Sequence, residues 1–582
     1  MTGQTSIHHD AAVPSRSDSG FWGSDVVAET LRMLEIPYIA LNPGASYRWL
    51  HDSLVNYLGN RAPQMLLCLH DETAVSIAQG YAKASGRMMA AALHANVGLM
   101  HACMPIFDAW CDRMPVLILG ATGPWDAARR RPWIDWIHTC ADQGGLVRNF
   151  TKWDNQPGSV PAAVEAILRA AQIAQTAPRG PVYVNLDSAV QEHELERLPE
   201  LPDVARYAPP SAAMPARDAL ERAAELLSNA RNPVMLAGRC SRSLDAWNAR
   251  VALAEKLNMR VLTQIKLGAA FPTDHPLHAA PPANRLSAQA RNLIAQADVI
   301  LSLDWLDLGG TLKQAYAEAA VGALVIQVSC DVHAHRGWSY DYHALAPTDV
   351  QLLCEPDAAV PHLVAACRSR GGGAPARLEV ATKSEARGDG LTLAILAERL
   401  RKTVAGRQVC ITRLPLGWNG AYTHFRHPLD YIGYDGGAGV GSGPGITVGA
   451  ALALRGSGRI AVGLHGDGDF IMGNTAVWTA THYKIPCLMV VCNNRSFFND
   501  ERHQEHIAIS RGRPPENRWI GQRVADPDID IAAMARSMGA VGIGPIEKPE
   551  DIGPALRLGV ETVEQGGVCV LDARVAPGYD AE

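Results

Sequence analysis

Short apolar runs alternate with helical patterns along most of the chain, and this alternation limits the fold more than any other feature. In the first third of the sequence the apolar runs are 38–41, 65–69, 88–93, 116–119 and 182–186. Strands that alternate with helices pair in parallel, because each crossover helix returns the chain to the same edge of the sheet. We therefore expect an α/β fold built from doubly wound parallel sheets.

The same pattern occurs in two further stretches, and 582 residues suit three domains of similar size at roughly 100–200 residues each. The second stretch has candidate strands at 234–237, 299–303 and 323–328, and the third at 460–464, 487–491 and 568–571, with a helical pattern over 470–483. Gly371-Gly372-Gly373 begins a segment typical of a linker. We place a flexible leader at 1–20, the first domain at 21–195, the central domain at 210–368, the linker at 369–389 and the third domain at 390–582.

The composition excludes several kinds of partner. The 53 basic and 59 acidic residues give a net charge of −6, without a long basic run, so we expect no binding to nucleic acid. The sequence has neither an apolar stretch of about 18 residues nor the pattern of a signal peptide, so we expect a cytoplasmic protein with no membrane segment. The twelve cysteines form no CxxC pair and predict free thiols. A small-molecule substrate is the expected partner.

Polar residues follow two strands of the third domain. His465-Gly466-Asp467-Gly468-Asp469 ends one strand, and Asn493-Asn494 ends the next. Ligands of open parallel sheets bind beyond the carboxyl ends of the strands. Glycines let backbone N–H groups approach a phosphate, while Asp467 and the Asn494 amide oxygen suit a divalent cation. Either element alone is more typical of a tight turn or a strand exit, but together they predict magnesium bound to a diphosphate.

Asp-turn, helix, apolar strand and Asn-Asn at this spacing resemble the thiamine diphosphate motif. The chain resembles the acetohydroxyacid synthase, benzoylformate decarboxylase and pyruvate oxidase group over nearly its whole length after residue 20. The resemblance implies a pyrimidine-binding domain, a central Rossmann-like domain and a diphosphate-binding domain in this order. It implies that Asp467, the Asn494 side chain and the Ser496 carbonyl bind the metal. The residues around the cofactor would include Gly466, Gly468 and Asp469.

The family also requires a glutamate that touches the aminopyrimidine ring of the cofactor. Glu72 matches it, in a strand end followed by His70-Asp71-Glu72 and a helix containing Gly80-Tyr81. The resemblance implies that Glu72 exchanges a proton with the ring nitrogen. The alternative is structural: Asp71 caps the helix, and Glu72 complements the helix dipole in its first turn.

The glycine-rich segment from Gly436 to Gly449 resembles the family segment that supports the bent cofactor. Val440 falls at the position of the bulky aliphatic wedge, although valine is smaller than the usual Leu, Met or Ile. The resemblance implies that the Ala438 carbonyl accepts a hydrogen bond from the aminopyrimidine. The alternative is a glycine-rich turn in which Val440 is an ordinary core residue.

His94 helps to distinguish which enzymes of this group the chain resembles most. In place of the Thr-Ser-Gly-Pro-Gly stretch of acetohydroxyacid synthases, this chain has Leu93-His94-Ala95-Asn96-Val97-Gly98. The Gln-Trp-Gln pattern that those enzymes carry after Asn-Asn is also missing. His94 ends a strand and resembles the active-site histidine of benzoylformate decarboxylase, a proton relay; the alternative is a histidine that only packs. The serine that follows Asn-Pro-Gly in that enzyme is Ala45 here, with Ser46 next, and its second histidine is not evident near 304–307.

We therefore favour a lyase that decarboxylates a 2-oxo acid, with aromatic acids among the candidates, through a cofactor-bound enamine. The alternative is an acetolactate synthase-like carboligase that forms a 2-hydroxy ketone or acid. A non-enzymatic relative would have lost Glu72 or Asp467, and both are present. The resemblance further implies a homodimer or homotetramer with active sites at subunit interfaces. It leaves open whether the central domain binds FAD.

Overall fold

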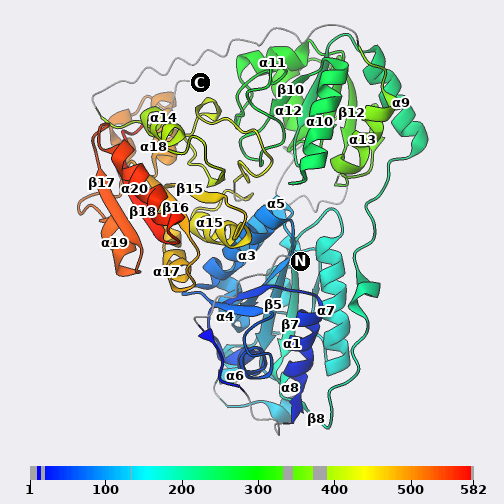
Figure 1. Ribbon diagram of the computed structural model, residues 1–582, viewed down its shortest axis with the longest axis vertical. Helices are drawn as coiled ribbons and strands as arrows, with labels where there is room; N and C mark the ends of the chain where they lie inside the picture. The colour runs from blue at the N-terminus through cyan, green and yellow to red at the C-terminus, as the bar shows by residue number, and fades with distance from the viewer. Residues whose placement is uncertain are drawn as a thin grey trace.

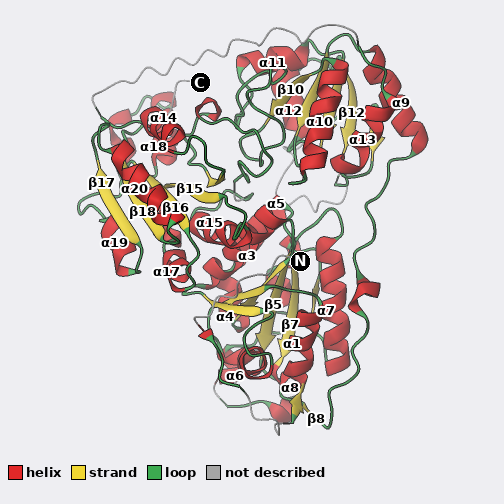
Figure 2. Cartoon of the chain, viewed as in Figure 1, coloured by secondary structure: helices red, strands yellow, loops and turns green. Residues whose placement is uncertain are grey.

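The computed structural model describes residues 10–14, 20–132, 134–331, 345–370, 390–434 and 436–578. Most of the leader expected at 1–20 and nearly all of the linker expected at 369–389 lie outside the described residues. Three parallel sheets, each covered by helices, confirm the predicted α/β fold (Figures 1 and 2). The domain boundaries stay predictions.

The first sheet has the strand order β3-β2-β4-β5-β7-β6, with every pair parallel. Alternate residues of its strands face different layers: Ile39 and Leu41 join one apolar cluster, whereas Tyr38 and Ala40 join another. The sheet is therefore buried on both faces, as its near-continuous apolar runs predict. Its strands are β2 (Tyr38–Leu41), β3 (Gln64–Leu67), β4 (Met89–Leu93), β5 (Val116–Thr122), β6 (Asp154–Asn155) and β7 (Val182–Asp187).

Helices cover both faces of this sheet. One layer contains α1 (Gly23–Met33) and α7 (Val160–Gln175), and the other contains α3 (Asp71–Ser85) and α5 (Cys103–Asp112). A short antiparallel pair, β1 (Phe21–Trp22) with β8 (Glu194–Leu195), joins the beginning and end of the domain. Smaller helices are α2 (Arg48–Asp52), α4 (Ala95–His101), α6 (Ile134–Ile137) and α8 (Ser188–Gln191).

The central and third sheets have five parallel strands each, in the orders β10-β9-β11-β12-β13 and β14-β15-β16-β18-β17. The central strands are β9 (Pro233–Ala237), β10 (Arg260–Thr263), β11 (Val299–Leu303), β12 (Leu324–Val328) and β13 (Val350–Leu352), with helices α9 (Arg217–Asn229), α10 (Leu244–Leu257), α11 (Ala288–Ala295), α12 (Leu308–Tyr316) and α13 (Pro356–Ala366). The third-domain strands are β14 (Val409–Arg413), β15 (Ile460–Gly466), β16 (Cys487–Asn493), β17 (Val541–Ile546) and β18 (Val568–Arg574), with helices α14 (Leu393–Thr403), α15 (Ser442–Ala453), α16 (Asp467–Gly473), α17 (Thr475–His482), α18 (Phe498–Ser510), α19 (Ile531–Ser537) and α20 (Ile552–Glu564).

The first and third domains meet where α3 packs against α15, at the centre of Figure 1. Glycines allow the two backbones to touch: a Cβ on Gly80 would lie 2.2 Å from the Ile446 carbonyl oxygen, and one on Gly449 would lie 1.9 Å from the Ile77 carbonyl oxygen. Ile77 and Ile446 belong to one buried apolar cluster that runs through both domains. The two domains of this chain therefore share a core.

The expectation of free thiols is confirmed. All twelve cysteines are free. Among the described helices, none has the length and apolar character that crossing a membrane requires.

Candidate active site

The carboxyl edge of the third sheet brings together the polar residues that follow β15 and β16. Asp467, which is 5% exposed, accepts hydrogen bonds from the Gly468 N–H at 2.8 Å and from the Ser496 N–H at 3.1 Å. The Asn494 Oδ1 accepts from the same Ser496 N–H at 2.9 Å. Oxygens of Asp467 and Asn494, two of the predicted metal ligands, therefore lie together around one backbone group.

This arrangement fits a hard cation and a phosphate. Burial raises the pKa of Asp467, a cost that a bound cation would offset. A Cβ on Gly466 would meet no atom within 4 Å, so the backbone there faces open space. The described residues contain no group of three His, Cys, Asp or Glu side chains suited to a metal, and the predicted site needs only one carboxylate beside an amide and a carbonyl oxygen.

Asp469 holds the glycine-rich segment in place. Its carboxylate accepts from the N–H groups of Gly441 at 2.8 Å and Gly443 at 3.3 Å. It also lies 3.1 Å from His465 Nδ1 and 3.3 Å from Arg413 Nε. Burial favours the neutral acid, but Arg413 and His465 outweigh it and hold the pKa of Asp469 well below its usual range. In this chain Asp469 therefore links the β15 turn to the start of α15.

Glu72 reaches from the first domain to the same glycine-rich segment. It lies in the first turn of α3, where its N–H donates to His70 Nδ1 at 3.2 Å. Its Oε1 is 3.0 Å from the position that a Cβ on Gly441 would take. Among the described residues nothing donates a hydrogen bond to its carboxyl group. Burial, and then the charge of Asp469, raise the pKa of Glu72. The carboxyl group is thus available to a ligand between the two domains.

Helix α5 shapes the segment that carries Ala438 and Val440. The buried Asp108 accepts from the Gly437 N–H at 3.1 Å and from the Ser442 hydroxyl at 2.7 Å, one on each side of Ala438 and Val440. Ala438 has a φ of +57°, and Val440 is partly buried. No sequence pattern indicated Asp108, because this contact joins residues that are far apart along the chain.

His94 lies at the end of β4, at the N-terminus of α4. Its Nδ1 is 2.9 Å from Ser46 Oγ, and its ring lies edge to face with the His138 ring at a centroid distance of 4.6 Å. Burial, and then His138, lower the pKa of His94 to about 4. Ser46 follows the Asn-Pro-Gly-Ala stretch that the sequence analysis singled out. No sequence pattern indicated His138.

Sequence profiles of thiamine pyrophosphate enzymes match all three domains. The N-terminal thiamine pyrophosphate-binding domain matches residues 21–145, the central domain 220–346 and the C-terminal thiamine pyrophosphate-binding domain 415–573. The chain belongs to the thiamine pyrophosphate enzyme family. It is therefore an enzyme whose cofactor is thiamine diphosphate, another name for thiamine pyrophosphate.

This thiamine pyrophosphate enzyme is similar to relatives with different reactions. It is 26% identical to benzoylformate decarboxylase of Pseudomonas aeruginosa over 74% of this chain and 79% of the relative. It is 23% identical to the acetolactate synthase large subunit of Lactococcus lactis over 92% of this chain and 90% of the relative. The benzoylformate decarboxylase structure from Polynucleobacter necessarius has a TM-score of 0.80 at 20% identity, covering 96% of this chain and all of that one, and shows the shared fold.

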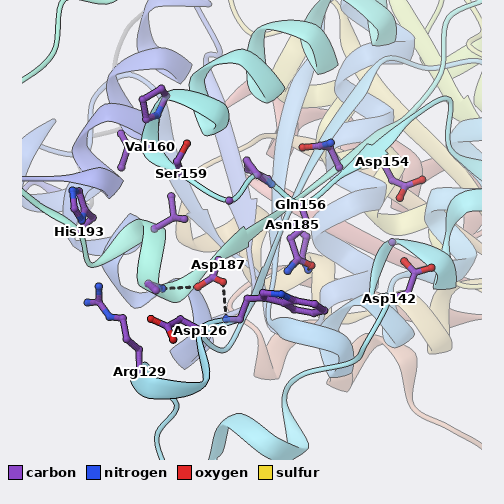
Figure 3. A pocket seen from close by; sticks show the side chains of 18 of the residues that line it. Asp126, Arg129, Asp142, Asp154, Gln156, Ser159, Val160, Asn185, Asp187 and His193 are labelled. Carbon is purple, nitrogen blue, oxygen red and sulfur yellow. Dashed lines mark hydrogen bonds between the residues drawn. The ribbon is translucent and has the colours of Figure 1, made fainter.

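The thiamine pyrophosphate enzyme has a further cavity of about 1140 Å³ in its first domain, away from the predicted site residues. Figure 3 shows it at the ends of β5, β6 and β7, with Asp126, Arg129 and His193 at its wall. Asp187 accepts from the N–H groups of Trp125 and Ala189 at 2.7 and 2.6 Å. None of the predicted cofactor or metal residues lines this cavity.

Proposed function

We propose that this enzyme is a thiamine diphosphate- and Mg²⁺-dependent lyase that decarboxylates a 2-oxo acid to an aldehyde and CO₂. One observation carries the proposal: the unpaired carboxyl group of Glu72 lies against Gly441, within the segment that Asp469 and Asp108 hold in place. A half-buried carboxyl group, with a raised pKa and no partner in the described chain, is suited to exchanging a proton with a bound ring.

The residues divide the work between metal and cofactor. Asp467, the Asn494 side chain and the Ser496 carbonyl would hold Mg²⁺. The backbone at Gly466 and Gly468 would approach the diphosphate, with Asp469 fixing the adjoining glycines. When bound, thiamine diphosphate supplies the carbanion and electron sink for cleaving a bond next to a carbonyl.

Three residues would serve the pyrimidine half of the cofactor. Val440 would support it from below, the Ala438 carbonyl would accept a hydrogen bond from its amino group, and Glu72 would hold and return the proton of its ring nitrogen. Because these groups come from two domains that share one core, their positions are set before the cofactor binds, which lowers the entropy cost of catalysis.

His94 would act on the substrate. With its pKa lowered to about 4, the ring stays neutral near pH 7, so it can donate a hydrogen bond to the substrate or accept a proton from it. The relationship to benzoylformate decarboxylase supports an aromatic 2-oxo acid as one candidate substrate.

A carboligase is the second candidate. The relationship to an acetolactate synthase large subunit spans 92% of the chain and supports the formation of a 2-hydroxy ketone or acid. The deciding experiment is NMR identification of products from pyruvate and from benzoylformate, each with and without thiamine diphosphate and Mg²⁺. Cofactor-dependent aldehyde supports the lyase, a 2-hydroxy ketone or acid supports the carboligase, and no product from either acid contradicts the proposed substrate range.

The proposal extends to the assembly and location of the enzyme. It includes a homodimer or homotetramer in the cytoplasm, whose active sites lie at subunit interfaces. Within the single chain, Glu72 of the first domain already lies beside Gly441 of the third. Sedimentation analysis with and without cofactor would measure the oligomeric state.

A further inference from the structure

Two histidine rings meet beyond the carboxyl ends of β4 and β5. His94 directly follows β4, and His138 follows α6 in the segment after β5. The rings lie edge to face with centroids 4.6 Å apart. The Asn96 amide donates to the Ile137 carbonyl at 3.3 Å, which ties the second histidine's segment to α4. The two rings are thus held together by both the side chains and the backbone around them.

Ser46 determines which nitrogen of His94 carries the proton. The Ser46 N–H donates to His94 Nδ1 at 3.4 Å, and Ser46 Oγ lies 2.9 Å from the same nitrogen. Because the Ala95 N–H donates to Ser46 Oγ at 3.1 Å, the hydroxyl proton is free to point at Nδ1. A ring nitrogen that accepts a hydrogen bond carries no proton. Neutral His94 is therefore protonated at Nε2 and presents that N–H as a donor.

The second ring has an unused nitrogen. His138 Nδ1 is buried and has no hydrogen-bond partner among the residues that the structure describes. A buried polar atom without a partner costs about 1–3 kcal/mol, so such atoms mark places where a ligand or ordered water completes the bonding. No hydrogen bond in the described chain fixes the proton of this ring, so Nδ1 can carry it and donate.

We infer that His138 is a second substrate-binding histidine and that it and His94 bind the two oxygens of a substrate carboxylate. This inference rests on the proposed function, because the carboxylate is that of the 2-oxo acid. An ionised carboxylate only accepts hydrogen bonds, and two imidazole N–H groups from adjacent rings supply one donor for each oxygen. The second histidine of this enzyme would then come from the first domain.

The test uses the full-length holoprotein with thiamine diphosphate and Mg²⁺, and two probes that carry the carboxylate without a reactive 2-oxo group, mandelate and lactate. Calorimetry measures their affinity for the wild type and for His138→Ala, His138→Gln and the control His362→Gln, whose side chain is exposed on α13. Tryptophan fluorescence measures thiamine diphosphate affinity in each protein.

We expect His138→Ala to weaken the better-bound hydroxy acid at least about tenfold, because a hydrogen bond to a charged group is lost. His138→Gln keeps an N–H donor and should recover part of this affinity. Thiamine diphosphate affinity should stay at the wild-type value in all variants, which a role in folding or cofactor binding would not allow. The control should match the wild type throughout.

Two results would overturn the inference: a wild type that binds neither hydroxy acid, or a His138→Ala protein that binds them as the wild type does. The proposed function fails separately. If the hydroxy acid binds through His138 but neither pyruvate nor benzoylformate is converted, the subsite stands and the reaction does not. If His138→Ala decarboxylates with an unchanged KM, the reaction stands and the subsite does not.

Discussion

Asp108 on α5 accepts the Ser442 hydroxyl at 2.7 Å, so a carboxylate of the first domain fixes the residue at which α15 of the third domain begins. The other oxygen of Asp108 accepts the Gly437 N–H. Ala438 and Val440 lie between these two anchors. The shape of the proposed cofactor support is thus imposed from the neighbouring domain.

Replacing Asp108 tests this imposed shape. Asp108→Ala leaves the buried Ser442 hydroxyl and the partly buried Gly437 N–H without acceptors, and we expect the free energy of unfolding to fall by about 2–6 kcal/mol, since each such group costs about 1–3 kcal/mol. Turnover should fall and thiamine diphosphate affinity should weaken. Ser442→Ala removes one anchor only and should have the smaller effect in both urea denaturation and cofactor titration. Equal effects, or none, would refute the two-anchor description.

Glu72→Gln should abolish most turnover and leave the fold intact, because no described residue donates to the carboxyl group.

The raised pKa of Glu72 in the wild type has a consequence for stability. The folded state binds this proton more tightly than the unfolded chain, so wild-type stability is lost as pH rises through the folded pKa. The variant lacks that loss and should therefore gain stability relative to the wild type between pH 4 and pH 7. Urea denaturation at pH 4 and pH 7 measures the free energy of unfolding of both proteins. A variant whose stability relative to the wild type falls as pH rises would contradict this expectation.

Asp467→Ala should weaken the binding of Mg²⁺ with thiamine diphosphate by at least about tenfold, which corresponds to a loss of about 1.4 kcal/mol. The reason is the loss of the only carboxylate among the proposed metal ligands. Fluorescence titration of thiamine diphosphate at several Mg²⁺ concentrations measures the effect. Asp500→Ala removes an exposed aspartate on nearby α18 and serves as the control. Wild-type affinity in Asp467→Ala would exclude it as a ligand.

The His94 ring should stay neutral in the folded protein down to about pH 5, because burial lowers its pKa to about 4. In the unfolded chain this histidine takes up a proton near pH 6.5, whereas in the folded chain it stays neutral down to its pKa of about 4. The free energy of unfolding therefore falls as pH falls from about 6.5 to about 4. His94→Gln lacks this term. The stability of the wild type relative to His94→Gln should thus decrease from pH 7 to pH 5 in urea denaturation; a difference independent of pH would show that burial does not shift this histidine.

Most of the fold follows from local pattern. The apolar runs predicted at 38–41 and 299–303 coincide with β2 and β11. The helical pattern over 470–483 is interrupted at Asn474, and the structure has two helices, α16 and α17, around it. The strand β14 was not predicted, although it supplies Arg413 to Asp469. Its mixed sequence lacks the apolar continuity that identified its neighbours.

The candidate site was predictable only where a short segment carries its own chemistry. The turn at Asp467 and the pair at Asn494 each have a local pattern, and the structure brings their oxygens together. Asp108 and His138 have none. Asp108 lies inside an otherwise ordinary helix, and His138 becomes informative only when tertiary packing sets its ring against His94.

The contact of α5 with the glycine-rich segment also bears on the order of assembly. The residues of the Asp467 turn all belong to the third domain, whereas the carboxylate that secures Gly437 and Ser442 belongs to the first. The proposed diphosphate site therefore needs only the third domain's own residues, while the proposed place for the pyrimidine is complete only when the N-terminal domain is docked. Cofactor binding then reports the completion of the tertiary structure.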